Sequence, residues 1–515
     1  MSDSPSNSPG AAIPSRKRKT IRRRTGPPPV ANNPFIVTVS TPCLRVPDAE
    51  TRKLIRSHVM LGKNKGKKIK KMLSQSSSRA AAIGSWINGD HDPDCQELQT
   101  IRAAERTSPA VLTPHPRTMM GSDLAAFQFA CEMPPADLEL VFKFFTMMSS
   151  ELYPINLCFA FHPQSSVWFD YLFLDEAYVH SILFGTRAYF ERRRTGTIGP
   201  ASLHHLAKTL ELLRQKLETP PPPCPYSADD TTKYFPDSTI SVVVGLTTAA
   251  DALGDADSAA KHTAGLHRLV MMRGGLGSLS GNRQLQIKAC RADLQVAVNR
   301  GMKPLFFADG MSWRSYLTSS SPQQQAGKRT ELHGILGETP DARLVNVWID
   351  LREFCRAANI AVATGRLLDP EPFQEVMTSV QYRLLHLGYE SRVGREEAWH
   401  EAMRLAMLAF ATTVFLRIHG MEMRYHDLGR RLKAAMLALG GARSGKEMEM
   451  LLWMAVVAGV AIFHAPADGS WLREYVRGAG VESWTAARGV LKDRLWIDHV
   501  HDKEGADVYY WLRGN

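Results

Sequence analysis

The chain has 515 residues, 44% of them hydrophobic, and a formal net charge of +12. That length is too great for one simple core and predicts two to four domains with a sizeable buried interior. The positive charge is uneven, because residues 1–80 hold 18 Lys and Arg against 3 Asp and Glu. The remaining residues hold 45 basic and 48 acidic side chains, so the excess charge belongs to the N-terminal part.

Seven cysteines are scattered through the chain, and no two lie within four residues of each other. This spacing excludes a CxxC metal pair and a dense disulfide framework, and it is typical of buried thiols in a reducing compartment. The N-terminus is polar and basic, without the apolar segment of a secretory signal. The longest apolar run, Leu451–Phe463, has 13 residues, whereas a bilayer needs about 20. We therefore expect an intracellular protein without a membrane partner, and a buried core helix at this run.

Composition predicts the order of the segments. Residues 1–33 are rich in Ser, Pro, Arg and Lys, which predicts a disordered basic arm. Residues 34–73 combine a short apolar strand, a helix over 47–60 and a lysine-rich run, and residues 74–122 have the composition of a linker. Dense helical patterning begins near residue 123. We expect two helical parts, 123–310 and 344–515, with a loop at 311–343 between them.

Two clusters of positive charge lie in the N-terminal part, in the strings RKRKTIRRR and KNKGKKIKK. Clusters of this size serve as nuclear localisation signals or as patches for polyanions. Nuclear import is the favoured interpretation, because exposed basic side chains on a flexible chain suffice for it. Contact with DNA phosphates would release counterions without reading sequence, and a solvated tail is the third interpretation. The residues that we predict for import or phosphate contact are Arg16, Lys17, Arg18, Lys19, Arg22, Arg23, Arg24, Lys63, Lys65, Lys67, Lys68, Lys70 and Lys71.

In the rest of the chain apolar residues recur at helical spacing, so we predict an all-α fold. Over 201–217 five leucines step by three and four residues, which predicts one apolar face on an amphipathic helix. The five leucines are Leu203, Leu206, Leu210, Leu213 and Leu217.

The segment 237–254 has a β-branched run that would suit a strand, but its length and a capping Asp237 favour a helix. Further helices are predicted at about 258–273, 282–300, 345–363, 372–387, 395–419, 425–439, 446–464, 470–478 and 483–498.

Two short motifs in the helical part contain residue types that are common in ligand sites. The string RGGLGSLSG at 273–281 follows a helix rather than a strand, which indicates a helix end and turn rather than a phosphate loop. His204 and His205 lack the HExxH spacing of a zinc site, so we expect histidines on a helix face.

A denser polar cluster lies near the C-terminus, where we expect a surface or capping role and keep metal binding as the alternative. Its members are Asp498, His499, His501 and Asp502. We predict no cofactor and no catalytic residue.

Several strings in the helical part resemble the fungal-specific transcription-factor regulatory domain of filamentous fungi, among them GLHRLVMMRGGL, NRQLQIKACRADL and VNVWIDLREFCRAANIA. The likeness covers about 170–515. The front block, FIVTVS and DAETRKLIRSHVMLGKNKGKK, is similar to the N-terminal segment of many proteins of that branch. The resemblance implies an all-helical regulatory and dimerisation domain in a nuclear regulator, with secondary-metabolite gene clusters as a frequent setting.

One feature of such regulators is missing. They usually begin with a six-cysteine, two-zinc cluster whose helix docks in the major groove, but residues 1–94 contain only Cys43. The expected function is therefore a nuclear, non-enzymatic transcription regulator that binds an importin-type receptor. It would meet DNA weakly or through a partner regulator, and would form a homo- or heterodimer. The alternatives are a helical scaffold without transcriptional output and, less favoured, a helical ligand-binding protein or enzyme.

Overall fold

The structure is a computed structural model, and all the residues that it describes belong to one compact unit, 76–515. The basic arm, the segment 34–73 and the linker 74–122 lie outside the described residues. The described residues are 127–148, 151–152, 158–159, 167–218, 235–307, 311–317, 332, 334–337, 340–389, 394–421, 423, 425–442, 444–464 and 466–514.

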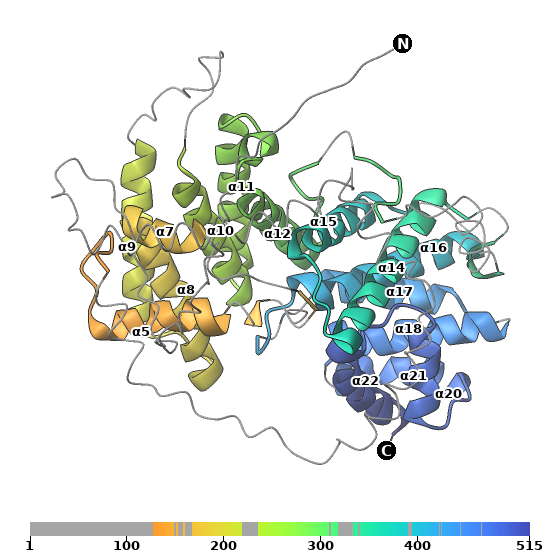
Figure 1. Cartoon of the computed structure of the whole chain (residues 1–515). Helices are drawn as coiled ribbons and strands as arrows, with labels where there is room; N and C mark the ends of the chain where they lie inside the picture. The colour runs from red at the N-terminus through yellow and green to blue at the C-terminus, as the bar shows by residue number, and fades with distance from the viewer. Residues whose placement is uncertain are drawn as a thin grey trace, which may run out of the picture. The chain divides into compact units, whose positions relative to one another are not determined.

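The described residues form an all-α fold, as the periodicity predicted, and none of them lies in a β-strand (Figure 1). The helices before residue 310 are α5 (Pro135–Lys143), the π-helix η2 (Phe144–Met148), α7 (Val167–Leu174), α8 (Glu176–Thr195), α9 (Pro200–Glu218), α10 (Asp237–Ala252), α11 (Ala256–Met272), the 3-10 helix η5 (Leu276–Leu279) and α12 (Arg283–Arg300). The helices after it are α14 (Ala342–Thr364), α15 (Pro370–His386), α16 (Arg395–Ala411), the π-helix η6 (Thr412–Leu416), α17 (His426–Ala438), α18 (Gly445–Ala461), α19 (Pro466–Gly469), the 3-10 helix η7 (Ser470–Leu472), α20 (Arg473–Gly478), α21 (Trp484–Lys492) and α22 (Asp498–Arg513).

Helix starts follow from short polar side chains that accept the free backbone N–H groups of the first turn. Asp255 accepts the N–H of Ser258 at 3.0 Å and starts α11. Asn282 accepts the N–H of Leu285 at 3.1 Å and starts α12. The glycine-rich string after α11 is a helix end and turn, as predicted, with Gly275 in the left-handed region at φ 82°.

The ambiguous segment forms helix α10. Its hydroxyl side chains accommodate the helix by bonding the preceding turn, as where Thr247 Oγ1 donates to Val243 O at 2.9 Å,. The predicted cap was wrong: the N-cap is Pro236, and Asp237 occupies the first helical position. Its carboxylate instead accepts Asn282 Nδ2 at 2.8 Å, which ties the start of α10 to the start of α12.

One hydrophobic core runs from Leu140 to Leu512, and α12 is its central link. α12 packs against α10 and α11 on one side and against α15 and α17 on the other. It is buried almost all round, and two of its buried charged side chains are paired: Arg291 Nε donates to Phe415 O at 2.8 Å, and Asp293 accepts Tyr382 Oη at 2.8 Å. The two predicted helical parts thus share a single core.

Two expected boundaries need correction. The segment 311–343 is not loop throughout: within its described residues, 334–336 are helical, and Leu332 and Leu336 are fully buried in the core. The predicted helix at 483–498 ends at Lys492, and α22 begins at Asp498. The residues between them include Leu495, Trp496 and Ile497, whose side chains are buried, so packing rather than local propensity sets the break.

Most of the long apolar run, Leu451–Ala461, forms the second part of α18, and every one of these residues is buried, which agrees with the predicted core helix. α18 packs against α16, α20, α21 and α22. Among the helices that the structure describes, none has both the length and the apolar character that spanning a membrane requires.

Candidate functional site

The residues predicted for import or phosphate contact lie outside the described residues, at positions 16–24 and 63–71. The candidate sites in the structure are therefore others: an exposed row of leucines on α9, a histidine pair between α8 and α9, and a polar cluster at the start of α22.

Helix α9 buries a different face from the one that its leucines predicted. Of the five, only Leu213 is buried, and the buried face otherwise consists of Ser202, His205 and Thr209. These small polar residues let α9 pack closely on α8, and their polar groups are bonded. Ser202 Oγ, for example, donates to Glu191 Oε2 on α8 at 2.7 Å. Polar contacts with α8 therefore decide which face of α9 is buried, and the spacing of the leucines cannot show these contacts.

Three leucines of α9 are left exposed in a row. Leu203, Leu210 and Leu217 retain 48%, 41% and 42% of their side-chain exposure. They are seven residues apart, so they lie on one face of the helix. Within the described residues, α9 packs mainly against α8, with a smaller contact to α10 (Figure 1). An exposed apolar row of this kind is typical of a docking surface.

The charged side chains beside this row alternate in sign. Along the helix they are Lys208, Glu211, Arg214 and Glu218, and they pair within the helix at 3.4 and 3.7 Å. The row is therefore an apolar strip with no net charge at its edge. Such a strip suits a helix that brings a similar strip.

The predicted histidine pair is divided between surface and core. His204 is exposed, whereas His205 is buried and its Nδ1 lies 3.0 Å from Nδ1 of His180 on α8. Burial lowers the pKa of both His180 and His205, so both are neutral at pH 7 and one donates to the other,. Asp137 of α5 lies 3.8 Å from His205 Nε2, and its carboxylate already accepts from Arg187 at 3.2 Å. The pair therefore fastens α9 to α8.

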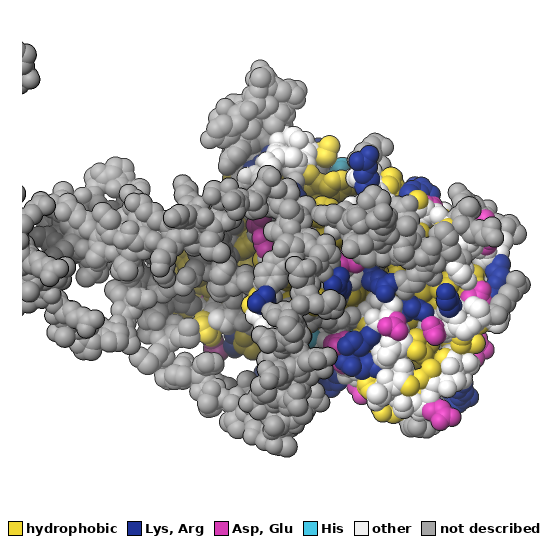
Figure 2. All heavy atoms as spheres, turned by 45° about the vertical axis from the view of Figure 1, so that its right-hand side comes forward, with side chains coloured by type: hydrophobic (Ala, Val, Ile, Leu, Met, Phe, Trp, Pro, Cys, Tyr) yellow, Lys and Arg dark blue, Asp and Glu magenta, His cyan; other side chains and the backbone are white. Residues whose placement is uncertain are grey.

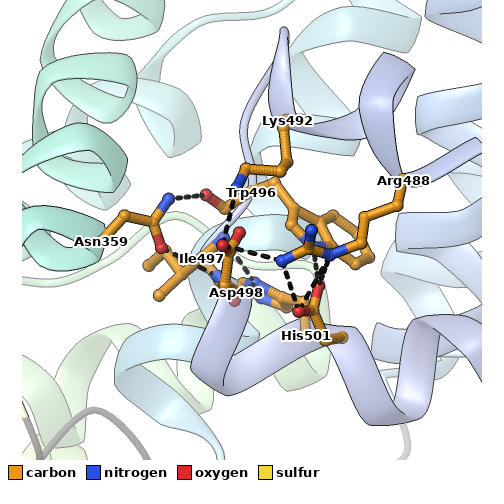
Figure 3. A network of polar contacts seen from close by, with 8 residues as sticks. Asn359, Arg488, Lys492, Trp496, Ile497, Asp498 and His501 are labelled. Atoms are coloured by element: carbon orange, nitrogen blue, oxygen red, sulfur yellow. Dashed lines mark hydrogen bonds and ion pairs between the residues drawn. The ribbon is translucent and has the colours of Figure 1, made fainter. Parts of the chain in front are cut away.

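The C-terminal cluster is shown in Figure 3. Arg488 of α21 donates to both carboxylate oxygens of Asp502 at 2.8–3.0 Å and to Asp498 at 2.9 Å. Lys492 Nζ bonds Asp498 Oδ2 at 2.7 Å. Both carboxylates are thus neutralised by cations of the chain, which leaves them poorly suited to a metal ion.

The two histidines of this cluster have different environments. His499 is exposed, as the expected surface or capping role allows, whereas His501 is 1% exposed and lies on the buried side of the start of α22. Its Nδ1 accepts the Ile497 N–H at 3.1 Å, and its Nε2 donates to Thr413 Oγ1 at 2.8 Å. Burial lowers the pKa of His501 to about 3, with a smaller contribution from the charge of Arg417. This neutral histidine fastens α22 to η6.

Asn359 completes the cluster from α14. Its Nδ2 donates to Trp496 O at 2.9 Å and its Oδ1 accepts the Asp498 N–H at 2.9 Å, so it holds the backbone on both sides of Ile497, where α22 starts. No local pattern could predict this contact, because Asn359 lies more than 130 positions away from Trp496. Within the described part of the chain, no group of three or more His, Cys, Asp or Glu side chains is placed to hold a metal ion.

The function must be argued from these features, because no protein-family model, curated protein or solved structure matches the chain.

Proposed function

We propose that the chain is a nuclear transcription regulator that works through protein–protein contact made by its all-α unit. The observation that carries the proposal is the uneven distribution of charge along the sequence. Residues 1–80 hold the excess positive charge, whereas residues 81–515, which include all the helices that the structure describes, are close to neutral. Exposed basic side chains suit both the acidic surface of an importin-type receptor and the phosphates of DNA.

The surface of the C-terminal helices supports the assignment of polyanion contact to the N-terminal part. On the face that Figure 2 shows, Lys and Arg side chains alternate with Asp and Glu over the described residues, and apolar side chains lie between them. A surface of mixed sign does not attract a polyanion strongly, because its charges cancel within a Debye length.

The leucine row of α9 supports self-association as the form of protein–protein contact. A second copy brings an identical row, and in an antiparallel pair Leu203 faces Leu217 while Leu210 faces its equivalent. The flanking charges alternate in sign, so two copies meet without net repulsion,. We therefore assign the row to a two-fold dimer of this chain.

The resemblance of residues 170–515 to the fungal-specific transcription-factor regulatory domain supports the same role. Because a six-cysteine cluster cannot form in residues 1–94, DNA targeting is assigned to a partner regulator. Control of a secondary-metabolite gene cluster is the setting that the resemblance implies.

Nuclear import is tested by changing all thirteen basic residues of the two clusters to alanine in the full chain fused to a fluorescent reporter. We expect the nuclear fraction to fall at least tenfold, because the import receptor loses the cations that it binds. A matched variant that exchanges Lys and Arg at the same positions keeps the charge and should stay nuclear. Nuclear concentration of the alanine variant equal to wild type would overturn the import role.

Transcriptional function is tested separately by chromatin occupancy. The alanine variant receives an independent import signal, so that import and DNA contact are no longer coupled. We expect occupancy at discrete promoters that survives neutralisation of the clusters but disappears when the partner regulator is removed. A nuclear chain with no occupancy at any promoter would instead indicate a scaffold without transcriptional output.

A further inference from the structure

A contact between two histidines joins α9 to α8, which lie side by side (Figure 1). Nδ1 of His180 and Nδ1 of His205 are 3.0 Å apart, and the two side chains are only 14% and 9% exposed. At this distance one Nδ1 must carry a proton and the other must present a lone pair, because two lone pairs or two N–H groups would repel each other. The contact therefore exists only in some protonation states of the two rings.

The number of protons on the pair decides when the contact breaks. Each neutral imidazole carries one proton, so one ring donates through Nδ1, and the other accepts there and carries its own proton on Nε2. A first extra proton from solvent adds to the free Nε2 of the donor ring and leaves the contact intact. A second extra proton has only the accepting Nδ1 to bind. Two N–H groups and two positive charges then face each other, and the contact is lost.

The charges that face the pair are of both signs. Asp137 of α5 lies 3.8 Å from His205 Nε2, and Glu176 of α8 lies 3.9 Å from His180 Nε2. Burial of the rings has the largest effect, and it lowers the pKa of both histidines below the ordinary value of 6.5,. The positive groups of α8 and α9 that act in the same direction as burial are Arg187, His204 and Lys208.

The other titratable groups of the neighbouring elements are engaged elsewhere. On α5, Glu139 and Lys143 pair with each other at 2.8 Å. The charged residues of α10 are Asp237 and Asp251, which lie in its first and last turns and accept from Asn282, Gln295 and Asn299. Cys131, before α5, keeps its proton because burial raises its pKa. Acid therefore acts on this contact through the two histidines themselves.

Loss of the contact affects the face of α9 that carries the leucine row. His205 lies between Ser202 and Lys216, which bond Glu191 of α8 and the α8 N-cap Asp175, so the histidines hold the middle of the helix. The leucine row lies on the outward side of the same helix. A helix that shifts on α8 presents the row in no fixed position, and ordering it again costs binding free energy.

We propose that the His180–His205 contact is a pH-sensitive switch: uptake of the second proton breaks it, loosens α9 on α8 and weakens the dimer formed through the leucine row. The last of these steps rests on the proposed dimer, whereas the loosening of α9 does not.

The test measures hydrogen exchange of the α9 amides in the full chain at pH 7.5 and pH 5.5, each relative to the intrinsic exchange rate at that pH. Loosened α9 binds protons that seated α9 does not, because the histidines of the seated helix have the lower pKa. Protection of α9 should therefore fall roughly tenfold at pH 5.5. Equal protection at the two pH values would overturn the proposal.

His180→Gln removes the switch but keeps the contact. Its amide accepts from a protonated His205 or donates to a neutral one, so protection of α9 should be the same at both pH values. His205→Gln gives a second reading by the same logic, and His204→Gln changes an exposed neighbour and should follow wild type. His501 and Asp251 titrate in all these chains, so their effect cancels. A loss of protection in both pair variants as large as in wild type would exclude the pair as the switch.

Sedimentation of the full chain at the same two pH values tests the effect on the dimer. The dissociation constant of wild type should rise roughly tenfold or more at pH 5.5, since each copy contributes one α9. That of His180→Gln should stay the same. A chain that is monomeric at every pH would overturn the dimer and the last step of the switch together, while the exchange of α9 decides the first steps on its own.

Discussion

At the scale of single residues, a fully buried ion pair connects α14 to α15 in the middle of the chain. Asp350 of α14 and Arg383 of α15 have side chains that are 0% exposed, and their charged atoms lie 2.6 Å apart. Asp350 also accepts the N–H groups of Tyr316 and Leu317 at 2.8 and 3.0 Å. The pair thus anchors the segment before α14 to both helices, and neither charge can be removed alone without exposing the other to an apolar surrounding.

Arg383→Met is expected to reduce the free energy of unfolding by about 3–5 kcal/mol, because it leaves the Asp350 carboxylate buried without its cation. Denaturant unfolding of the full chain measures the effect. The control is Arg430→Met: this side chain is 73% exposed and pairs with Asp427 on the surface. Its loss should cost less than about 1 kcal/mol. Equal effects of the two variants would contradict the structural role of the buried pair.

At the scale of elements, α9 is the helix through which we propose that the chain dimerises. Its small polar residues pack on α8 while three of its leucines face outward. A dimer through this row buries the leucines of both copies, and the hydrophobic effect supplies the affinity.

The triple variant Leu203→Gln, Leu210→Gln, Leu217→Gln should raise the dissociation constant of the dimer. Both copies carry the substitutions, so six leucines each lose roughly 1 kcal/mol of burial, and the constant should rise by roughly four orders of magnitude. Sedimentation at several concentrations measures it, and thermal unfolding of the monomer should not change.

The control for this experiment is Leu174→Gln with Leu437→Gln, which removes two leucines that are 77% and 50% exposed on α7 and α17. That variant should remain dimeric. A wild-type chain that is monomeric at every concentration would rule out the dimer assigned to α9.

At the scale of the whole molecule, His501 makes stability depend on pH. It joins η6 to α22 while neutral, and its pKa is lowered to about 3 from an ordinary value of 6.5. Between these values the unfolded chain binds a proton that the folded chain does not, so stability falls as pH falls. Between pH 7 and pH 5 this histidine alone should cost about 2 kcal/mol of the free energy of unfolding.

The measurement compares His501→Gln with His499→Gln at both pH values. His501→Gln removes the titrating group, so its stability should depend less on pH than that of wild type, whereas His499→Gln changes an exposed side chain and should follow wild type. Asp251 contributes in the opposite sense: burial raises its pKa to about 6, so it stabilises the folded chain as pH falls through 6. This contribution is the same in wild type and in both variants, so it cancels in the comparison. An unchanged pH dependence in His501→Gln would exclude His501 as its source.

The sequence by itself determined the class of fold and most of the helices. The glycines after α11 were placed from local pattern, because they act on backbone groups within one turn,. The caps Asp255 and Asn282 were not predicted, and the predicted cap Asp237 was wrong. The long apolar run could be assigned to a core helix because its length is too short for a bilayer and its residues have no polar face.

Only the tertiary structure decided which faces are buried and which polar groups meet. The leucines of α9 point outward because Ser202 and His205 find partners on α8, and the predicted helix at 483–498 breaks because buried contacts hold the residues after Lys492. His501 is neutral because it is buried, and Thr413, 88 residues away, accepts its hydrogen bond. Periodicity reports the shape of one element, whereas burial depends on contacts between elements that are far apart in the chain.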